Sequence, residues 1–218
     1  MLERFTWFRQ SAMRFEGDGL AVYIDPWGTT PVDVPADVIL ITHAHFDHFQ
    51  PEEIERLRKT DTKLVAPHDV AKELSGDVTA VAPGESHEVG GVKFSTVSAY
   101  NVVEHRLGAH PKANNWVGYV MELGDSTYYH SGDTDHAPEL DDVRADVAMV
   151  TIGGDPYTMG PEEAAGLVKA IGPKLAVPMH FGFVVGERGF ADRFRDSAAP
   201  IPVEVMEPAA GWGPPPGG

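Results

Sequence analysis

The alternation of hydrophobic and polar positions predicts short β-strands in the first third of the chain. Apolar and β-branched residues recur at residues 5–8, 12–17 and 20–27, and turns that contain glycine or proline separate these segments. Residues 37–42 (DVILIT) form a nearly continuous apolar run, which is typical of a strand covered on both faces. We therefore expect an N-terminal sheet with at least one fully buried strand.

Helical patterns begin at residue 51. Residues 51–59 start with a proline and two acids, as the first turn of a helix commonly does. Residues 160–172 hold the clearest helix, because a proline and two acids open it and a glycine follows its end. Shorter helices are predicted at residues 68–75 and 191–198.

Strand patterns fill the rest of the chain. They fall at residues 63–67, 79–85, 87–100, 116–124, 126–134, 146–154, 175–182 and 203–208. A β-rich first half followed by alternating strands and helices predicts a layered α/β fold with mixed sheets. We expect one domain over residues 1–208 and a disordered Pro/Gly-rich tail at 209–218.

Composition and charge narrow the possible partners. The chain has 33 acids and 17 bases, a formal net charge of -16, which repels phosphate backbones and argues against nucleic acid as a partner. No apolar run reaches the ~18 residues of a membrane span, and the first residues lack a signal-peptide pattern, so we expect a cytoplasmic protein. Cysteine is absent, so any metal must be bound by nitrogen and oxygen. The oligomeric state stays open, with a homo-oligomer among the options.

One segment concentrates groups that bind metals. Residues 38–49 (VILITHAHFDHF) place His43, His45, Asp47 and His48 within six positions, directly after the predicted buried strand. Imidazole and carboxylate are the ligands of zinc, manganese or iron where thiolate is missing. His43 and His45 share one face of an extended chain, whereas Asp47 and His48 follow the turn and can face a second position nearby. The spacing therefore predicts a metal site.

Residues 42–48 (THAHFDH) resemble the H-x-H-x-D-H motif of the metallo-β-lactamase fold superfamily. Asp133 in GDT and His180 in PMHFG follow in the expected order and resemble its bridging-aspartate and last metal-histidine motifs. The segments TWF, YIDPW and HSGDTD look like the branch that includes ascorbate-6-phosphate lactonase-like hydrolases. The resemblance implies an αββα sandwich of two mixed sheets, with two metal ions at one edge between the sheets.

The resemblance also implies a ligand set and a reaction. The first ion is expected on His43, His45 and His110, the second on Asp47, His48 and His180, and Asp133 is expected to bridge them. Zinc is the first expectation for both ions and manganese the alternative. A hydroxide that bridges the ions would attack the substrate, which makes Asp47 and Asp133 the expected catalytic residues. Bound ions would also make the cleft locally positive, so a small anionic substrate stays compatible with the acidic chain.

Four histidines compete for the last ligand position of the first ion. His68, His87, His105 and His110 all lie between the motif and Asp133. His110 precedes the strand predicted at 116–124, as the histidine of the family does. We therefore favour His110, with His105 as the next choice.

Three further residues are candidates for supporting roles. Asp25 in YIDPW either accepts the second N–H of a metal histidine or simply starts a turn before proline. His130, at a predicted strand end, is expected beside the ligands or in the core. Tyr157 lies in a glycine-rich loop that either aims it at the substrate or packs it against the domain.

Three functions remain open from the sequence. The first is hydrolysis of a small ester or lactone, including a phosphorylated one, for which Lys112, Arg106 and Arg188 are candidate phosphate contacts. The second is phosphodiester hydrolysis of the phospholipase D-like kind. The third is a non-catalytic metal-binding module, which the complete set of ligand positions disfavours.

Overall fold

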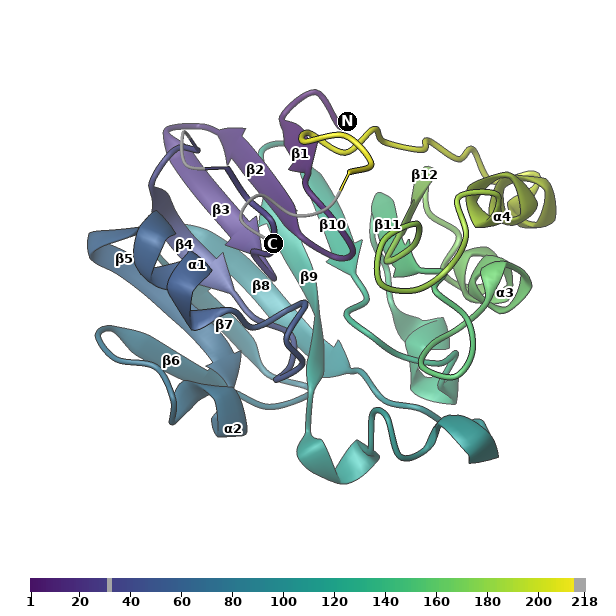
Figure 1. The fold of residues 1–218 in the computed structure, drawn as a ribbon, viewed down its shortest axis with the longest axis horizontal. Coiled ribbons are helices and arrows are strands. Elements are labelled where there is room, and N and C mark those ends of the chain that lie inside the picture. The colour runs from purple at the N-terminus through teal and green to yellow at the C-terminus, as the bar shows by residue number, and fades with distance from the viewer. Residues whose placement is uncertain (31–32, 214–218) are drawn as a thin grey trace.

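Two six-stranded sheets pack face to face, with helices on their outer faces (Figure 1). The computed structural model describes residues 1–30 and 33–213. The first sheet contains β1 (Phe5–Trp7), β2 (Met13–Gly17), β3 (Leu20–Ile24), β4 (Ala36–Leu40), β5 (Arg58–Pro67) and β6 (Val78–Val81), in that order. Its first three strands are antiparallel neighbours, and β3 to β6 run parallel.

The second sheet follows the same mixed plan. It contains β7 (Ser86–Val89), β8 (Val92–Ser98), β9 (Val117–Leu123), β10 (Ser126–His130), β11 (Val147–Thr151) and β12 (Leu175–Met179), in the order β12-β11-β10-β9-β8-β7. Strands β7 to β10 are antiparallel, and β10, β11 and β12 are parallel.

Helices lie outside both sheets. They are α1 (Pro51–Leu57), α2 (His68–Ala71), α3 (Pro161–Ile171) and α4 (Phe190–Ala198), with short 3-10 helices η1 (Glu104–Arg106), η2 (Lys112–Asn114) and η3 (Pro138–Asp142). Figure 1 shows α1 and α2 beside the first sheet and α3 and α4 beside the second, which confirms the predicted αββα sandwich. Over residues 1–30 and 33–213, no helix combines the length and apolar character that crossing a bilayer requires.

Strand β4 explains the continuous apolar run of the sequence. Val38 and Leu40 belong to the core cluster that joins the two sheets, while Ile39 packs with Ile54 and Leu57 of α1 on the other face. Because successive side chains of a strand point to opposite faces, a strand between two layers must be apolar at nearly every position. The loop that leaves this strand starts from rigid, buried backbone.

Several predicted boundaries were wrong. The helix predicted at 51–59 ends at Leu57, and β5 begins at once with Arg58. The helix predicted at 68–75 keeps only its first turn. The strand predicted at 203–208 is reduced to one bridge, between Val203 and Ala176. The residue before Val203 is Pro202, which has no backbone N–H to donate to a neighbouring strand.

The tail predicted to be disordered is ordered over residues 209–213. The Trp212 ring stacks on Phe183 with centroids 5.2 Å apart and meets Trp7 edge-on at 5.5 Å. The Ala209 N–H donates to the Trp7 carbonyl at 2.8 Å. A single tryptophan thus supplies the apolar contact that its Gly/Pro-rich surroundings lack. Residues 214–218 of the predicted tail lie outside the described part of the chain.

Candidate metal centre

The candidate ligands gather where strands from both sheets end. Asp25 directly follows β3, residues 43–48 follow β4, Asp133 follows β10 and His180 directly follows β12. Only His110 comes from a longer connection, the loop between β8 and β9. Loops at strand ends are held by the rigid sheet, which is a common position for binding and catalytic groups.

The carboxylate of Asp133 lies in the middle of this cluster. Its Oδ2 atom is 3.0 Å from Nε2 of His180 and 3.4 Å from Nε2 of both His48 and His110. Nε2 of His43 is 4.0 Å away. Imidazoles from three separate loops therefore face one carboxylate oxygen.

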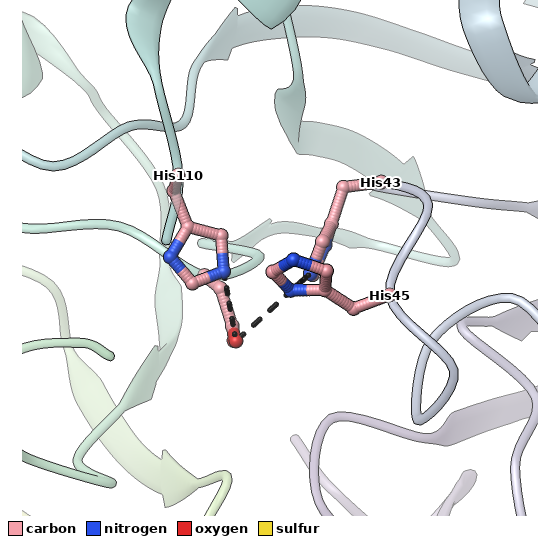
Figure 2. Close-up of side chains that lie close together, drawn as sticks. His43, His45 and His110 are labelled. Carbon is pink, nitrogen blue, oxygen red and sulfur yellow. Dashed lines mark hydrogen bonds and ion pairs between the residues drawn. The ribbon is translucent and has the colours of Figure 1, made fainter. Parts of the chain in front are cut away.

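Among the described residues, three groups of side chains have donor atoms within 4.8 Å of one another: a first set of His43, His45, His110 and Asp133, a second set of Asp47, His48 and His180, and a third of Asp25, His43 and His48. Figure 2 shows the imidazoles of His43, His45 and His110 turned toward one another. Nε2 of His43 is 3.1 Å from Nδ1 of His45. Two nitrogen ligands at ~2.0–2.1 Å from one ion have a similar separation.

Unsatisfied buried atoms test whether a metal fits. Among the described residues, Nε2 of His48, Nε2 of His110 and Oδ1 of Asp133 are buried without a hydrogen-bond partner. Leaving a polar group buried and unpaired costs about 1–3 kcal/mol, so such atoms require a functional reason. A divalent cation would accept these lone pairs, and an all-nitrogen-and-oxygen donor set suits zinc, manganese or iron. The residues fit a metal centre.

The orientation of His48 is set by Asp25. His48 Nδ1 lies 2.7 Å from Asp25 Oδ2, so its N–H is donated to the carboxylate and Nε2 is left for the centre. The same carboxylate accepts the backbone N–H of Thr42 at 2.7 Å and its hydroxyl at 2.6 Å. With its oxygens occupied, Asp25 supports a ligand rather than acting as one.

The structure brings His110 into the cluster and leaves His105 outside. His110 is fully buried, and its Nδ1 lies 2.9 Å from Asn101 Oδ1 and 3.2 Å from the carbonyl of Tyr157. His105 has a side chain that is 59% exposed and pairs with Asp155 at 2.6 Å. Of the two histidines favoured from the sequence, only His110 can reach the donor groups of the first set.

Burial and charge set the protonation of the cluster without metal. Burial alone would raise the pKa of Asp133, but His180 and His48 hold it well below its usual value. Burial likewise opposes protonation of His180, yet Asp133 raises its pKa to about 9. For His45, burial lowers the pKa to about 4. The Asp133 carboxylate is therefore charged, and at pH 7 His180 is protonated whereas His45 is neutral.

Asp47 faces the second set. Its Oδ2 is 3.3 Å from Nε2 of His180 and 3.9 Å from Nε2 of His48. Burial would raise its pKa, but His48 and His180 together outweigh burial and lower the pKa to about 2. The side chain is thus an anion that can bind a cation or take up a proton.

His130 serves the backbone rather than the centre. Its Nε2 lies 2.8 Å from the Ser11 carbonyl, and its Nδ1 accepts the N–H of Gly132 at 3.3 Å. Both ring nitrogens are therefore occupied. The buried ring ties the N-terminal turn to the residues just before Asp133.

Gln10 is a site residue that the sequence did not reveal. It is fully buried, its backbone carbonyl accepts the N–H of His180 at 2.8 Å, and its Nε2 donates to Asp47 Oδ2 at 3.4 Å. It also has a positive φ of 43°, and His180 has one of 61°. Such backbone strain is common at functional sites. No local pattern marks a glutamine in this role.

Thr42, Asn101 and Trp116 were also missed. The Thr42 hydroxyl lies 2.9 Å from His43 Nδ1, and Asn101 holds the Nδ1 of His110. The Trp116 ring packs against His43 and His45 with centroids 4.9 and 5.1 Å away. Thr42 adjoins the motif and could have been suspected, whereas nothing in the sequence marks the other two.

A cavity of about 170 Å³ opens beside the cluster. It is lined by His45, Phe46, Asp47, His110, Asp133, Tyr157, His180, Val184 and Val185. Tyr157 is 44% exposed, so it lies at the surface of the cavity rather than packed in the core.

The three cations expected to contact a phosphate do not line this cavity. Arg106 donates to Asp155 at 2.6 Å, and Lys112 donates to Glu139 at 3.2 Å. Arg188 lies over an indole ring, 4.7 Å from its centroid. None of the three is therefore placed to contact a phosphate in this cavity.

Comparison with known proteins identifies the family to which the chain belongs. Residues 4–180 match the family model described as a β-lactamase superfamily domain. A UPF0173 metal-dependent hydrolase of Methanopyrus kandleri is 32% identical over 197 residues, covering 82% of this chain and 84% of that protein. A protein of the same name from Thermodesulfovibrio yellowstonii is 31% identical over 226 residues, covering 89% and 84%.

Solved structures agree with the fold. A candidate metal-dependent hydrolase from Parabacteroides distasonis superposes with a TM-score of 0.82 at 28% identity, over 94% of this chain and 92% of that one. A metallo hydrolase from Ignicoccus hospitalis gives 0.74 at 26% identity, over 94% of each chain. A metallo-β-lactamase fold protein from Bacillus subtilis, at 15% identity and a TM-score of 0.68 over 91% of this chain and 88% of that one, shows the fold alone.

Proposed function

The chain belongs to the β-lactamase superfamily, and on this premise we propose that it is a hydrolase that depends on two divalent metal ions. The observation that carries the proposal is the position of Asp133, whose Oδ2 atom faces histidines of both donor groups. Relatives over 30% identical carry the name metal-dependent hydrolase.

Seven residues would hold the ions. His43, His45 and His110 form the first site, Asp47, His48 and His180 the second, and Asp133 contributes to both. Zinc suits this donor set best among common ions, with manganese as the alternative. When bound, such ions polarise a substrate carbonyl or phosphoryl group and lower the pKa of a bound water toward neutrality.

The side chains around the ions have separate tasks. Asp47, charged at neutral pH, lines the cavity and would orient the attacking water by accepting a hydrogen bond from it. Asp25 and Asn101 keep the Nε2 atoms of His48 and His110 directed inward. Tyr157 lines the cavity and would contact the substrate.

Small carboxylic esters and lactones are the best-supported substrates. No lysine or arginine lines the cavity to bind a phosphodiester backbone, and the net charge of -16 opposes polyanions. The phospholipase D-like alternative is therefore second. A non-catalytic metal-binding module is third, because every expected ligand position holds a histidine or an aspartate that reaches the cluster.

Metal content and hydrolysis of the Asp133→Ala variant test the proposal. We expect about two ions per wild-type chain by elemental analysis and hydrolysis of ester or lactone substrates, both lost in the variant. Asp141→Ala, which removes an exposed aspartate paired with His136, is the control and should keep both. Full metal and activity in Asp133→Ala would refute the bridging role. A metal-loaded wild type that cleaves no ester, lactone or phosphodiester would refute the hydrolase.

A further inference from the structure

The cavity beside the cluster has two chemically different parts. Its five histidine and aspartate lining residues belong to the proposed metal sites, and the other four are Phe46, Tyr157, Val184 and Val185. We propose that Phe46, Val184 and Val185 bind an uncharged, apolar acyl portion of the substrate, so that the substrate is a short-chain neutral ester or lactone. This inference rests on the proposed hydrolase function and names the substrate class of the same site.

Exposed apolar side chains are concentrated at this cavity. Six large hydrophobic side chains are exposed among residues 1–30 and 33–213, and three of them, Phe46, Tyr157 and Val184, line it. Phe46 is 57% exposed and Val184 is 46% exposed. Single exposed apolar residues are ordinary, but a group of them around one opening indicates a surface that binds something apolar.

The apolar wall is held in place before any ligand arrives. Gln10 Oε1 accepts the N–H of Val184 at 3.3 Å, and the neighbouring Phe183 stacks on Trp212. Phe46 makes an edge-on contact with Trp27, with centroids 6.1 Å apart. Binding sites for small molecules are usually preformed in this way.

No lining residue compensates a negative charge away from the cluster. A carboxylate or phosphate placed against Phe46, Val184 and Val185 would lose its water without gaining a partner, which is unfavourable. The volume of about 170 Å³ is below the ~300–1,000 Å³ of pockets for drug-sized ligands, so the acyl portion must be short.

A matched pair of ligands tests the inference by binding alone. The probes are 4-methylpentanohydroxamate and succinic acid monohydroxamate, which share a metal-binding group and a similar shape but end in an isopropyl group and a carboxylate. Calorimetry on the zinc-loaded protein should show at least about tenfold tighter binding of the apolar probe. Equal or tighter binding of the succinate probe, or binding of neither, would overturn the inference.

A charge placed in the wall should reverse this preference. Val184→Arg should raise the affinity for the succinate probe relative to the apolar probe at least about tenfold. Leu107→Arg adds the same charge at a similarly exposed apolar position (48%) outside the cavity lining, and should leave the ratio within about twofold. Equal shifts in both variants would show that net charge, not the wall, decides the preference.

Kinetics separate this inference from the proposed function. In 4-nitrophenyl esters from acetate to pentanoate, kcat/KM should rise about threefold per added methylene. Hydrolysis of esters without any dependence on chain length would overturn the apolar wall and leave the hydrolase intact. Tight binding of the apolar probe without hydrolysis of any ester, lactone or phosphodiester would support the wall and refute the hydrolase.

Discussion

The two sheets contribute to the metal cluster in different ways. The first sheet supplies its donors from one loop after β4, and the second supplies His110, Asp133 and His180 from three loops that are far apart in the chain. A single loop of six residues can place its donors through local backbone geometry. Three separate loops meet only if the rest of the fold holds them together.

The supports differ accordingly. The first loop depends on Asp25, which binds Thr42 and His48 from a neighbouring strand end. Two of the donor loops of the second sheet, those of His110 and Asp133, are joined by Arg106, whose buried guanidinium contacts Asp135 at 2.9 Å, Asp155 at 2.6 Å and Glu163 at 3.0 Å. Through these contacts Arg106 connects the loop of His110 with the loops of Asp133 and Tyr157. Asp25 therefore positions the donors of the first sheet, and Arg106 positions donor loops of the second sheet.

The largest expected effect is on a ligand of the second sheet. His110→Ala should lower the metal content by about one ion per chain and ester hydrolysis by at least about a hundredfold, because no other described histidine reaches its place. His105→Ala, nearby but exposed, is the control and should keep both ions. Elemental analysis of the two variants measures the metal content, and metal loss in His105→Ala alone would make His105, not His110, the ligand.

Removal of the Arg106 guanidinium should destabilise the protein. Arg106→Met leaves Asp135, which is 1% exposed, without its cationic partner, and breaking such a buried pair should lower the free energy of unfolding by about 3 kcal/mol. Arg193→Met breaks an exposed pair with Glu162 and should change it little. Chemical denaturation measures both. Equal stability of the two variants would mean that the second-sheet loops do not need Arg106.

The support of the first loop should have a smaller effect. Asp25→Asn keeps the shape but removes the charge that accepts the His48 N–H, so metal affinity should fall about 10–100-fold with little change in fold. Competition with a metal chelator measures the affinity. Asp77→Asn, at an exposed aspartate paired with Lys63, is the matched control. Unchanged affinity in Asp25→Asn would leave Asp25 a purely structural residue.

The smallest expected effect concerns protons. Without metal, His180 has a pKa of about 9 and is protonated at pH 7, whereas His45 has a pKa of about 4 and is neutral. Because a metal binds only neutral imidazole, His180 must release a proton. So must His48, whose pKa is held well above its usual value, against burial, by Asp133, Asp25 and Asp47. Metal affinity should therefore rise at least about tenfold per pH unit from pH 7 toward 9. Calorimetry in buffers of different ionisation enthalpy counts the protons. In His180→Ala at least one fewer proton should be released; an unchanged count would show that it comes from another group.

The pattern of the sequence was sufficient for much of the fold. The continuous apolar run of β4 and the proline and glycine at the two ends of α3 are local signals, and both elements form where they were predicted. Local signals failed where tertiary contacts outweighed them. Residues 58 and 59, predicted in the helix, belong to β5, and Trp212 packs residues 209–213 of a tail whose composition predicts disorder.

The same division applies to the candidate site. The sequence by itself identified the candidate donors at residues 43–48, since imidazole and carboxylate groups spaced along one short loop are typical of a metal site, and it indicated Asp133 and His180 through their motifs. Only the tertiary structure decided between His110 and His105, because burial and contacts with Asn101 depend on loops distant in the chain. It also revealed the contacts of Gln10 and Arg106, and it showed that none of Lys112, Arg106 and Arg188 lines the cavity. Side-chain chemistry is a local property, whereas the meeting of distant side chains is a property of the fold.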